Sequence, residues 1–346
     1  MAARLGIFLA ILCDCLVACA ASVFKKPKGL KFKRYMIHSF LRSASFRDPD
    51  KQLLKRRPTT TEAYRTTVQK HSLTPDIVAI DNDADILWLS KPQRSSGKTL
   101  LYFHGGAYVN PAHPQHIETL IDCMKACHAQ NLELSVAIVA YTIAPAGVYP
   151  LQLRQAVSAL RYLTETAQIA PSDVLIAGDS AGVNIILALL SHLAHPHPEI
   201  PPIDLHDEKL GGALLISPWV TFDTTAASMK YNFYHDHVHP GLLDISAKKF
   251  LGDSETDAYN EPLKAPADWW KDLQTQQLSI LAAECEIFFD DIIAFADKVK
   301  IHNPQTQVLI ASGEVHVQMV MDKILKVPSP KSQRYFEQWL EERLRD

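Results

Sequence analysis

The sequence predicts an α/β fold in which a mostly parallel sheet is flanked by helices. Short apolar runs bounded by turn residues alternate with helical patterns through most of the chain. The run "LSVAIVAYTIAP", residues 134–145, is apolar almost without a break, as a strand buried on both faces should be. Leu153, Ala156, Leu160 and Leu163 then fall on one face of the following helix. Such alternation requires crossover connections and therefore a parallel sheet.

The elements follow one another in a regular order. Residues 76–90 form a predicted hairpin that turns at Asn82-Asp83. The other predicted strands lie within residues 98–106, 134–145, 173–182, 212–220, 278–283 and 306–312. An apolar helix is expected over 183–194, and an amphipathic helix over 332–346 closes the chain.

Two stretches lie outside this alternation. Residues 25–72 are basic and predicted to be helical, and residues 221–270 are irregular, with the runs "HDHVH" and "WW". Both are predicted to lie over the strand ends as a cap. Because no linker is evident, we expect one catalytic domain, residues 73–346, preceded by the basic segment and an apolar N-terminal segment, residues 1–24.

The N-terminal segment is long enough to cross a membrane. Leu5–Phe24 contains twenty residues and one charge, Asp14. An uncleaved anchor is the favoured interpretation; a signal peptide cleaved after Ala18-Cys19-Ala20 and a soluble helix are the alternatives. Asp14 would cost about 2.5–3.5 kcal/mol at mid-span. The basic run 25–34 favours anionic lipid and a cytosolic body.

Charge and cysteine content exclude several classes of function. Residues 58–346 hold 22 Lys and Arg against 35 Asp and Glu, so this acidic body is unsuited to nucleic acid. The six cysteines show neither a disulfide framework nor metal-type spacing. We interpret them as small buried hydrophobic residues: Cys13, Cys15, Cys19, Cys123, Cys127 and Cys285.

The sequence "GDSAG", residues 178–182, matches the G-x-S-x-G nucleophile elbow. A sharp turn from strand to helix lifts the Ser180 hydroxyl out of the sheet edge. That turn crowds the positions two before and two after the serine, so glycine is needed at Gly178 and Gly182. The motif follows the apolar run "VLIA" and precedes an apolar helix, which is the context it requires. Ser180 is therefore the predicted nucleophile, with Asp179 beside it in the motif.

A serine nucleophile needs a pocket of hydrogen-bond donors for the oxyanion. The candidate is "HGGAY", residues 104–108, at the end of the strand 98–103, where glycines allow the backbone to approach the substrate. His104 is expected to anchor this loop. The predicted oxyanion hole consists of the backbone N–H groups of the two glycines, Gly105 and Gly106, together with that of Ala181.

The base and the acid are expected after later strands. His316, in "SGEVHVQMV", follows the last strand and fits the chain order Ser, acid, His. The acid should lie just past the penultimate strand, where Glu286 is favoured and Asp290 is the alternative. Asp290 and Asp291 suit the first turn of the next helix, where acidic groups interact favourably with the helix dipole.

Three further histidines alternate in the "HDHVH" run. In an extended segment His235, His237 and His239 would lie on one side, which allows a zinc interpretation. No fourth ligand is evident. We therefore predict neither a metal nor another cofactor.

Together these residues resemble the hormone-sensitive-lipase-like branch of the α/β-hydrolases, which includes carboxylesterases and arylacetamide deacetylases. The resemblance covers about residues 72–346 and rests on "HGGAY", "YTIAPAGVYP", "GDSAG", "ISPWV" and "AECEIFFDDI" with "VHV". It implies an α/β-hydrolase fold with Ser180 as nucleophile, His316 as base and Glu286 in the place of the acid. It also implies an oxyanion hole lined by Gly105, Gly106, Ala107 and Ala181. It also implies hydrolysis of short- to medium-chain carboxylic esters without a cofactor, under a helical cap.

Three positions depart from the family pattern. Ala107 stands where a third glycine is usual, Glu286 where Asp is usual, and Val317 where an aromatic residue is common. Through the apolar N-terminus and the "APADWW" segment, residues 265–270, the chain resembles fungal esterases of this branch, including membrane-anchored sterol deacetylases and hydrolases of natural-product pathways. That likeness implies the endoplasmic reticulum membrane as location; secretion after signal cleavage is the alternative.

The sequence thus predicts a membrane-associated serine carboxylesterase. The expected partner is a small lipophilic ester, such as an acetylated sterol or polyketide. Two other functions use the same residues or the same fold: an amidase or arylformamidase with the same triad, and a non-catalytic ligand-binding protein.

Overall fold

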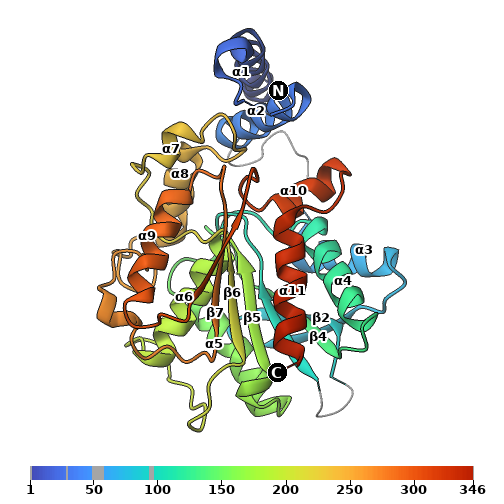
Figure 1. The fold of residues 1–346 in the computed structure, drawn as a ribbon, viewed down its shortest axis with the longest axis vertical. Helices are drawn as coiled ribbons and strands as arrows, with labels where there is room; N and C mark the ends of the chain where they lie inside the picture. The colour runs from blue at the N-terminus through green and yellow to red at the C-terminus, as the bar shows by residue number, and fades with distance from the viewer. Residues whose placement is uncertain (1, 29, 49–57, 93–96, 346) are drawn as a thin grey trace.

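A computed structural model describes residues 2–28, 30–48, 58–92 and 97–345. Its centre is an eight-stranded sheet in the order β1-β2-β4-β3-β5-β6-β7-β8 (Figure 1). Strands β3 to β8 are parallel, while β2 is antiparallel to both β1 and β4. The predicted α/β-hydrolase fold is confirmed. The strands are β1 (Asp76–Ile80), β2 (Ala84–Ser90), β3 (Lys98–Phe103), β4 (Leu134–Ala140), β5 (Val174–Asp179), β6 (Gly212–Ile216), β7 (Leu278–Ala283) and β8 (Gln307–Ala311).

Helices cover both faces of the sheet. Apolar side chains of α3, α4 and α11 form the core on one face, and those of α5, α6 and α9 form it on the other. The helices are α1 (Ala2–Lys25), α2 (Phe32–Arg47), α3 (Thr60–Lys70), α4 (Pro114–His128), α5 (Leu151–Arg161), α6 (Ala181–Ala194), α7 (Ser228–Tyr231), α8 (Pro240–Leu251), α9 (Phe289–Lys300), α10 (Gln318–Leu325) and α11 (Lys331–Arg345). Short helical turns span Tyr162–Thr166, Pro171–Asp173 and Ala267–Trp270.

The predicted hairpin at the sheet edge is present. Strands β1 and β2 pair up to Ile80 and Ala84, and Asn82 and Asp83 in the connecting loop have left-handed φ values of 64° and 57°. Asn and Asp adopt this conformation more readily than most residues, which explains why the chain turns there.

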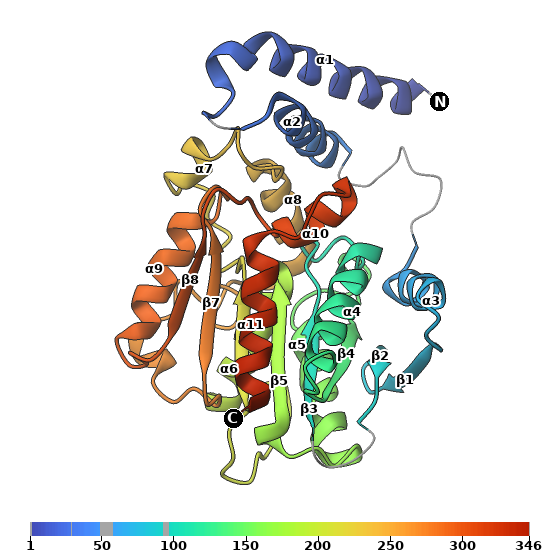
Figure 2. The same cartoon turned by 45° about the vertical axis from the view of Figure 1, so that its right-hand side comes forward.

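The N-terminal helices lie across one end of the sheet. Helices α1 and α2 pack against each other above this end, beside α7, α8 and α10 (Figure 2). Asp14 of α1 accepts hydrogen bonds from Ser43 at 2.7 Å and from the Arg47 guanidinium at 2.9 Å. The placement fits the predicted cap, whose boundaries remain a prediction.

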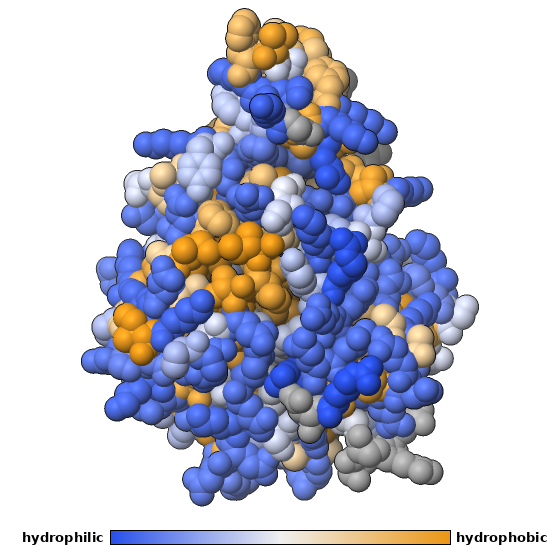
Figure 3. Space-filling view, viewed as in Figure 1, coloured by the Kyte–Doolittle hydropathy of each residue, from blue (hydrophilic) through white to orange (hydrophobic). Residues whose placement is uncertain are grey.

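One helix among the described residues is long and apolar enough to cross a membrane. Within Arg4–Lys25 an 18-residue stretch has a mean hydropathy of 2.5, and only 11% of that stretch is buried. The space-filling view shows its apolar side chains at the top of the molecule (Figure 3). Length and composition are those of a span, and a signal sequence has the same features.

The cysteines divide into two groups. Cys123 and Cys127 are buried in α4, as predicted. The prediction is wrong for the other four: Cys13 and Cys19 are exposed, and Cys15 and Cys285 are half-buried. Apolar composition does not imply burial in α1, because that helix covers the molecule from outside.

Candidate active site

Ser180 lies in a sharp turn between β5 and α6. Its backbone has φ 53° and ψ −119°, a conformation that L-residues adopt only under constraint. Both glycines of the motif are required because the carbonyl of Phe103 lies close to each of them. A Cβ atom on Gly178 would lie 2.5 Å from the carbonyl oxygen of Phe103, and one on Gly182 only 2.0 Å from it. The turn thus forms tightly against the end of β3.

Ser180, His316 and Glu286 form a hydrogen-bonded chain. His316 Nε2 is 2.9 Å from Ser180 Oγ, and His316 Nδ1 is 2.7 Å from Glu286 Oε2. The other oxygen of Glu286 accepts the N–H of Ala283 at 2.7 Å. Because a carboxylate only accepts, Nδ1 carries the proton and Nε2 is free to accept the serine proton. All three side chains are buried.

The alternative acid lies elsewhere. Asp290 accepts hydrogen bonds from the Ser228 N–H at 2.8 Å and from the Tyr231 hydroxyl at 2.6 Å. It therefore joins α9 to α7 of the cap and makes no contact with His316. The structure brings Glu286, the favoured residue, to the histidine.

The electrostatic setting suits a general base. Burial opposes the charged form of His316, but the hydrogen bond and the charge of Glu286 outweigh it and raise the pKa of His316. The carboxylates of Asp236 and Asp179 act in the same direction. The imidazolium that forms during catalysis is therefore stabilised by its surroundings.

One predicted oxyanion-hole donor is already engaged. The N–H of Gly105 donates to Asp179 Oδ1 at 3.0 Å, so it does not point into the cavity as a free donor. The prediction for Gly105 is wrong in this respect. Gly106 and Ala107 line the cavity beside Ser180, and Ala181 is the first residue of α6, where N–H groups have no intrahelical acceptor. The N–H groups of these three residues therefore remain the candidate donors for an oxyanion.

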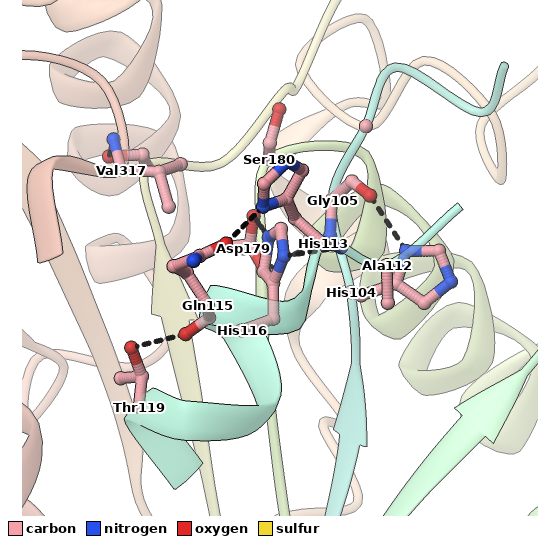
Figure 4. A network of polar contacts seen from close by, with 12 residues as sticks. His104, Gly105, Ala112, His113, Gln115, His116, Thr119, Asp179, Ser180 and Val317 are labelled. Carbon is pink, nitrogen blue, oxygen red and sulfur yellow. Dashed lines mark hydrogen bonds and ion pairs between the residues drawn. The ribbon is translucent and has the colours of Figure 1, made fainter. Parts of the chain in front are cut away.

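Asp179 holds the oxyanion loop in place. Besides the bond from the Gly105 N–H, Asp179 Oδ1 accepts a hydrogen bond from the Tyr102 hydroxyl at 2.8 Å. The other oxygen, Oδ2, is 3.3 Å from His116 Nε2. His116 Nδ1 accepts the N–H of His113 at 3.0 Å, so Nε2 carries the proton and donates to Asp179. Figure 4 shows His116 on the first turn of α4, beside Asp179. Burial alone would raise the pKa of Asp179, but these donors lower it.

Sequence reasoning missed Tyr102 and His116. Tyr102 is in β3, and His116 follows the "HGGAY" loop by eight positions. A polar ring close after that loop is the only signal that could have pointed to His116. Nothing in the pattern marks Tyr102, because a tyrosine in a strand is usually a packing residue.

His104 anchors the loop, as predicted. Its ring is fully buried and stacks on Tyr141 with ring centroids 4.4 Å apart. Its Nε2 is 3.2 Å from the Thr60 hydroxyl, and its Nδ1 donates to the carbonyl of Gly105 at 2.7 Å. Burial lowers the pKa of His104 to about 4, so the ring is neutral and structural.

A cavity of about 340 Å³ opens at Ser180 and His316. Its walls are mostly apolar and come from both the sheet and the cap. Helix α2 contributes Leu41 and Ser45, and Val317 occupies the position next to the base. Three residues of the 221–270 stretch and three of α10 also lie along the wall: Val238, Leu242, Leu243, Val320, Met321 and Ile324.

The three alternating histidines do not form a common site. Residues 232–236 form a turn, so the run is not the extended segment that would place all three histidines on one side. His235 accepts a hydrogen bond from His38 through its carbonyl, His237 lines the cavity, and His239 stacks on Phe46. No group of three or more metal-type side chains is present among the described residues.

We expect Ala107→Gly to stabilise the protein by about 0.5–1 kcal/mol. Ala107 has φ 53°, which costs an L-residue about 1–2 kcal/mol, and glycine removes that strain while adding some entropy to the unfolded chain. Urea unfolding measures the difference. The control is Ala129→Gly at φ −62°, which should destabilise the protein. Equal loss of stability in both variants would contradict the prediction.

Comparison with known proteins places the chain in a family. Residues 100–320, more than half of the chain, match the family model described as the α/β-hydrolase fold. The protein therefore belongs to the α/β-hydrolase fold family.

Its relatives are named esterases and acetyl hydrolases. An esterase of Acinetobacter venetianus is 28% identical over 223 residues, covering 61% of this chain and 66% of that protein. Steryl acetyl hydrolase 1 of Saccharomyces cerevisiae is 24% identical over 209 residues, covering 58% of this chain and 46% of that protein. The chain thus spans less than two thirds of the length of both relatives.

Solved structures share the fold. An esterase/lipase from an uncultured bacterium has a TM-score of 0.67 at 20% identity and covers 92% of this chain and 100% of its own. An esterase of the bacterial hormone-sensitive lipase family has a TM-score of 0.66 at 20% identity, covering 91% and 99%. With the family match and the curated relatives, these likenesses confirm the predicted resemblance to hormone-sensitive-lipase-like esterases.

Proposed function

We propose that this protein is a serine carboxylesterase that acts through an acyl-enzyme. The observation that carries the proposal is the continuous chain from Glu286 through His316 to Ser180, at the floor of an apolar cavity. The intact triad also argues against a purely ligand-binding role. The named activities of the relatives support the same reaction class.

The geometry performs the reaction in two halves. Ser180 Oγ attacks the ester carbonyl as its proton moves to His316 Nε2, and the N–H groups of Gly106, Ala107 and Ala181 bind the oxyanion. Collapse of the tetrahedral intermediate breaks the C–O bond, and the alcohol leaves with the proton of His316. Water, deprotonated by the same nitrogen, then releases the acid and restores Ser180.

The expected substrate is a small lipophilic ester. The cavity walls are mostly aliphatic, and about 340 Å³ accommodates a short acyl chain together with part of an alcohol. Two relatives are named an acetyl-hydrolase and a steryl acetyl hydrolase, which supports acetyl esters of apolar alcohols, in sterol or secondary metabolism.

The test is release of p-nitrophenol from acetyl, butyryl and octanoyl esters by the wild-type protein and by Ser180→Ala. We expect hydrolysis that falls with acyl length and is abolished by the substitution. Matched p-nitroanilides separate an esterase from an amidase, since both use the same triad. A folded wild-type protein that cleaves neither ester nor anilide would overturn the proposal.

We further propose that α1 associates with membranes, supported by its exposed apolar side chains and by the basic residues that follow. Phe8 and Leu12 are 56% and 44% exposed, and Lys25, Lys26 and Lys28 come directly after the apolar run. The proposed location is the endoplasmic reticulum membrane.

The double variant Phe8→Asp, Leu12→Asp should therefore release the full chain from membranes. Each acidic residue costs about 2.5–3.5 kcal/mol at the centre of a membrane-inserted helix. Co-flotation with vesicles that contain anionic lipid measures the bound fraction. The matched control is Ile301→Asp, at a residue after α9 that is 66% exposed. This variant should leave the vesicle-bound fraction unchanged. Undiminished flotation of the double variant would rule out membrane binding through α1.

A further inference from the structure

A second buried carboxylate lies beside the triad. Asp236 is fully buried in the turn between α7 and α8. One of its oxygens accepts the N–H of Ile287 at 2.9 Å, and Ile287 directly follows Glu286. The other accepts the N–H of His237 at 2.7 Å and lies 3.2 Å from the Nδ1 atom of the same histidine. Asp236 thus joins the cap to the loop that carries the catalytic acid.

Helix α2 fixes this turn from outside. The His38 ring donates to the carbonyl of His235, and the buried Arg42 guanidinium donates to the carbonyl of Asp236 at 2.6 Å. Four residues further along α2, the Phe46 ring stacks on His239 with centroids 3.9 Å apart. Three turns of one helix therefore hold three residues of the "HDHVH" run, on both sides of His237. His237, in the middle of this run, is held in one orientation.

The partner of His237 determines which nitrogen carries its proton. Burial would raise the pKa of Asp236, but His237, the nearby His316 and the Ile287 N–H lower it to about 2. Asp236 Oδ1 can only accept, and it lies 3.2 Å from Nδ1 of His237 without hydrogen-bond geometry, so we assign the ring hydrogen to Nδ1. The Nε2 atom, on the opposite side of the ring, then has a free lone pair.

His237 is placed at the cavity. Its ring lines the wall, with its centroid 6.2 Å from that of His316. The neighbouring wall residues Val238, Leu242 and Phe288 offer no hydrogen-bonding side chain. Among the described residues, Nε2 of His237 has no hydrogen-bond partner. A polar atom of this kind in an apolar pocket fixes the orientation of a ligand.

We propose that His237 Nε2 accepts a hydrogen bond from a free hydroxyl group of the ester substrate. This inference rests on the proposed esterase function and narrows its substrate to partially acylated alcohols that keep a second hydroxyl group near the scissile ester. His237 would then determine specificity, while Asp236 and Arg42 position it. An ester without the hydroxyl gives Nε2 no such partner and reacts more slowly.

The experiment compares monoacetates of α,ω-diols, from two to six carbons, with alkyl acetates of equal length. Acetate release gives kcat/KM for each pair in the full-length protein. We expect one diol length to be preferred over its alkyl partner by roughly tenfold. The ratio should fall to about one in His237→Phe, because phenylalanine keeps the ring but accepts no such bond, whereas His237→Gln should retain part of it. Because the ratio compares kcat/KM for two substrates in the same variant, a general loss of activity cancels out.

His239→Phe is the matched control. This ring stacks on Phe46 outside the cavity wall, so the diol preference should remain. Two results would overturn the proposed role of His237 and leave the esterase function intact. One is wild-type activity without a diol preference at any length, and the other is a preference that persists in both His237 variants. Absence of activity on p-nitrophenyl acetate as well would overturn the esterase function and this inference with it.

Discussion

Replacement of Glu286 by glutamine is expected to lower kcat by about 10⁴-fold, the loss seen when a triad acid becomes an amide. Glu286 Oε2 accepts the Nδ1–H of His316 at 2.7 Å. The amide removes the charge that stabilises the imidazolium, and its NH₂ group favours the tautomer with the proton on Nε2. That tautomer cannot accept the proton of Ser180.

The pH profile gives a second readout of the same change. Because Glu286 raises the pKa of His316, the acid limb of kcat/KM in the wild-type protein should lie above the ordinary pKa of histidine, about 6.5. Activity rises as pH rises through that value and His316 loses its proton. In Glu286→Gln the residual activity should have its acid limb at lower pH.

Asp290→Asn is the matched control for the assignment of the acid. Asp290 contacts Ser228 and Tyr231 of the cap and lies outside the triad, so this variant should keep kcat within about threefold of the wild type. If Asp290→Asn lost activity as severely as Glu286→Gln, Glu286 would not be the only acid that supports His316.

Replacement of Gly182 by alanine is expected to prevent stable folding. Its Cβ would lie 2.0 Å from the carbonyl oxygen and 2.6 Å from the carbonyl carbon of Phe103, both backbone atoms of β3. No side-chain movement relieves such a contact, so β3 and the elbow must separate. A loss of more than about 4 kcal/mol in the free energy of unfolding follows. Urea unfolding, or the soluble yield, measures it.

Gly6→Ala is the control for that prediction. A Cβ on Gly6 meets nothing within 4 Å, and the residue lies inside α1, so alanine should be tolerated and should favour the helix. If Gly182→Ala unfolded at the same urea concentration as the wild type, the close approach of the elbow to β3 would be refuted.

Much of the fold could be predicted because its signals are local. The unbroken apolar runs gave β4 and β7, and Asn82-Asp83 marked the hairpin turn. Ser180 and His316 were predictable for a related reason. The nucleophile elbow needs glycines at fixed offsets, and the chain order of the triad limits where the base can lie.

The errors concern contacts between distant segments. Gly105 and Asp179 are 74 positions apart, and only the assembled structure shows that the carboxylate takes the N–H that had been assigned to the oxyanion. The alternating histidines of the "HDHVH" run allowed a common site only if the run were extended. The hydrogen bonds of Asn232 to His235 and Asp236 instead form a turn, and α2 holds it in place. Periodicity carries no information about such partners.

The contribution of α2 to the cavity wall has a consequence for how this enzyme can diversify. Leu41 and Ser45 shape the space above Ser180, yet they precede the first strand and belong to no part of the hydrolase core. Replacement of this helix by that of a related chain would change the cavity wall without altering any reacting group. Changes in this helix can thus alter which substrates fit the cavity, while Ser180, His316 and Glu286 stay the same.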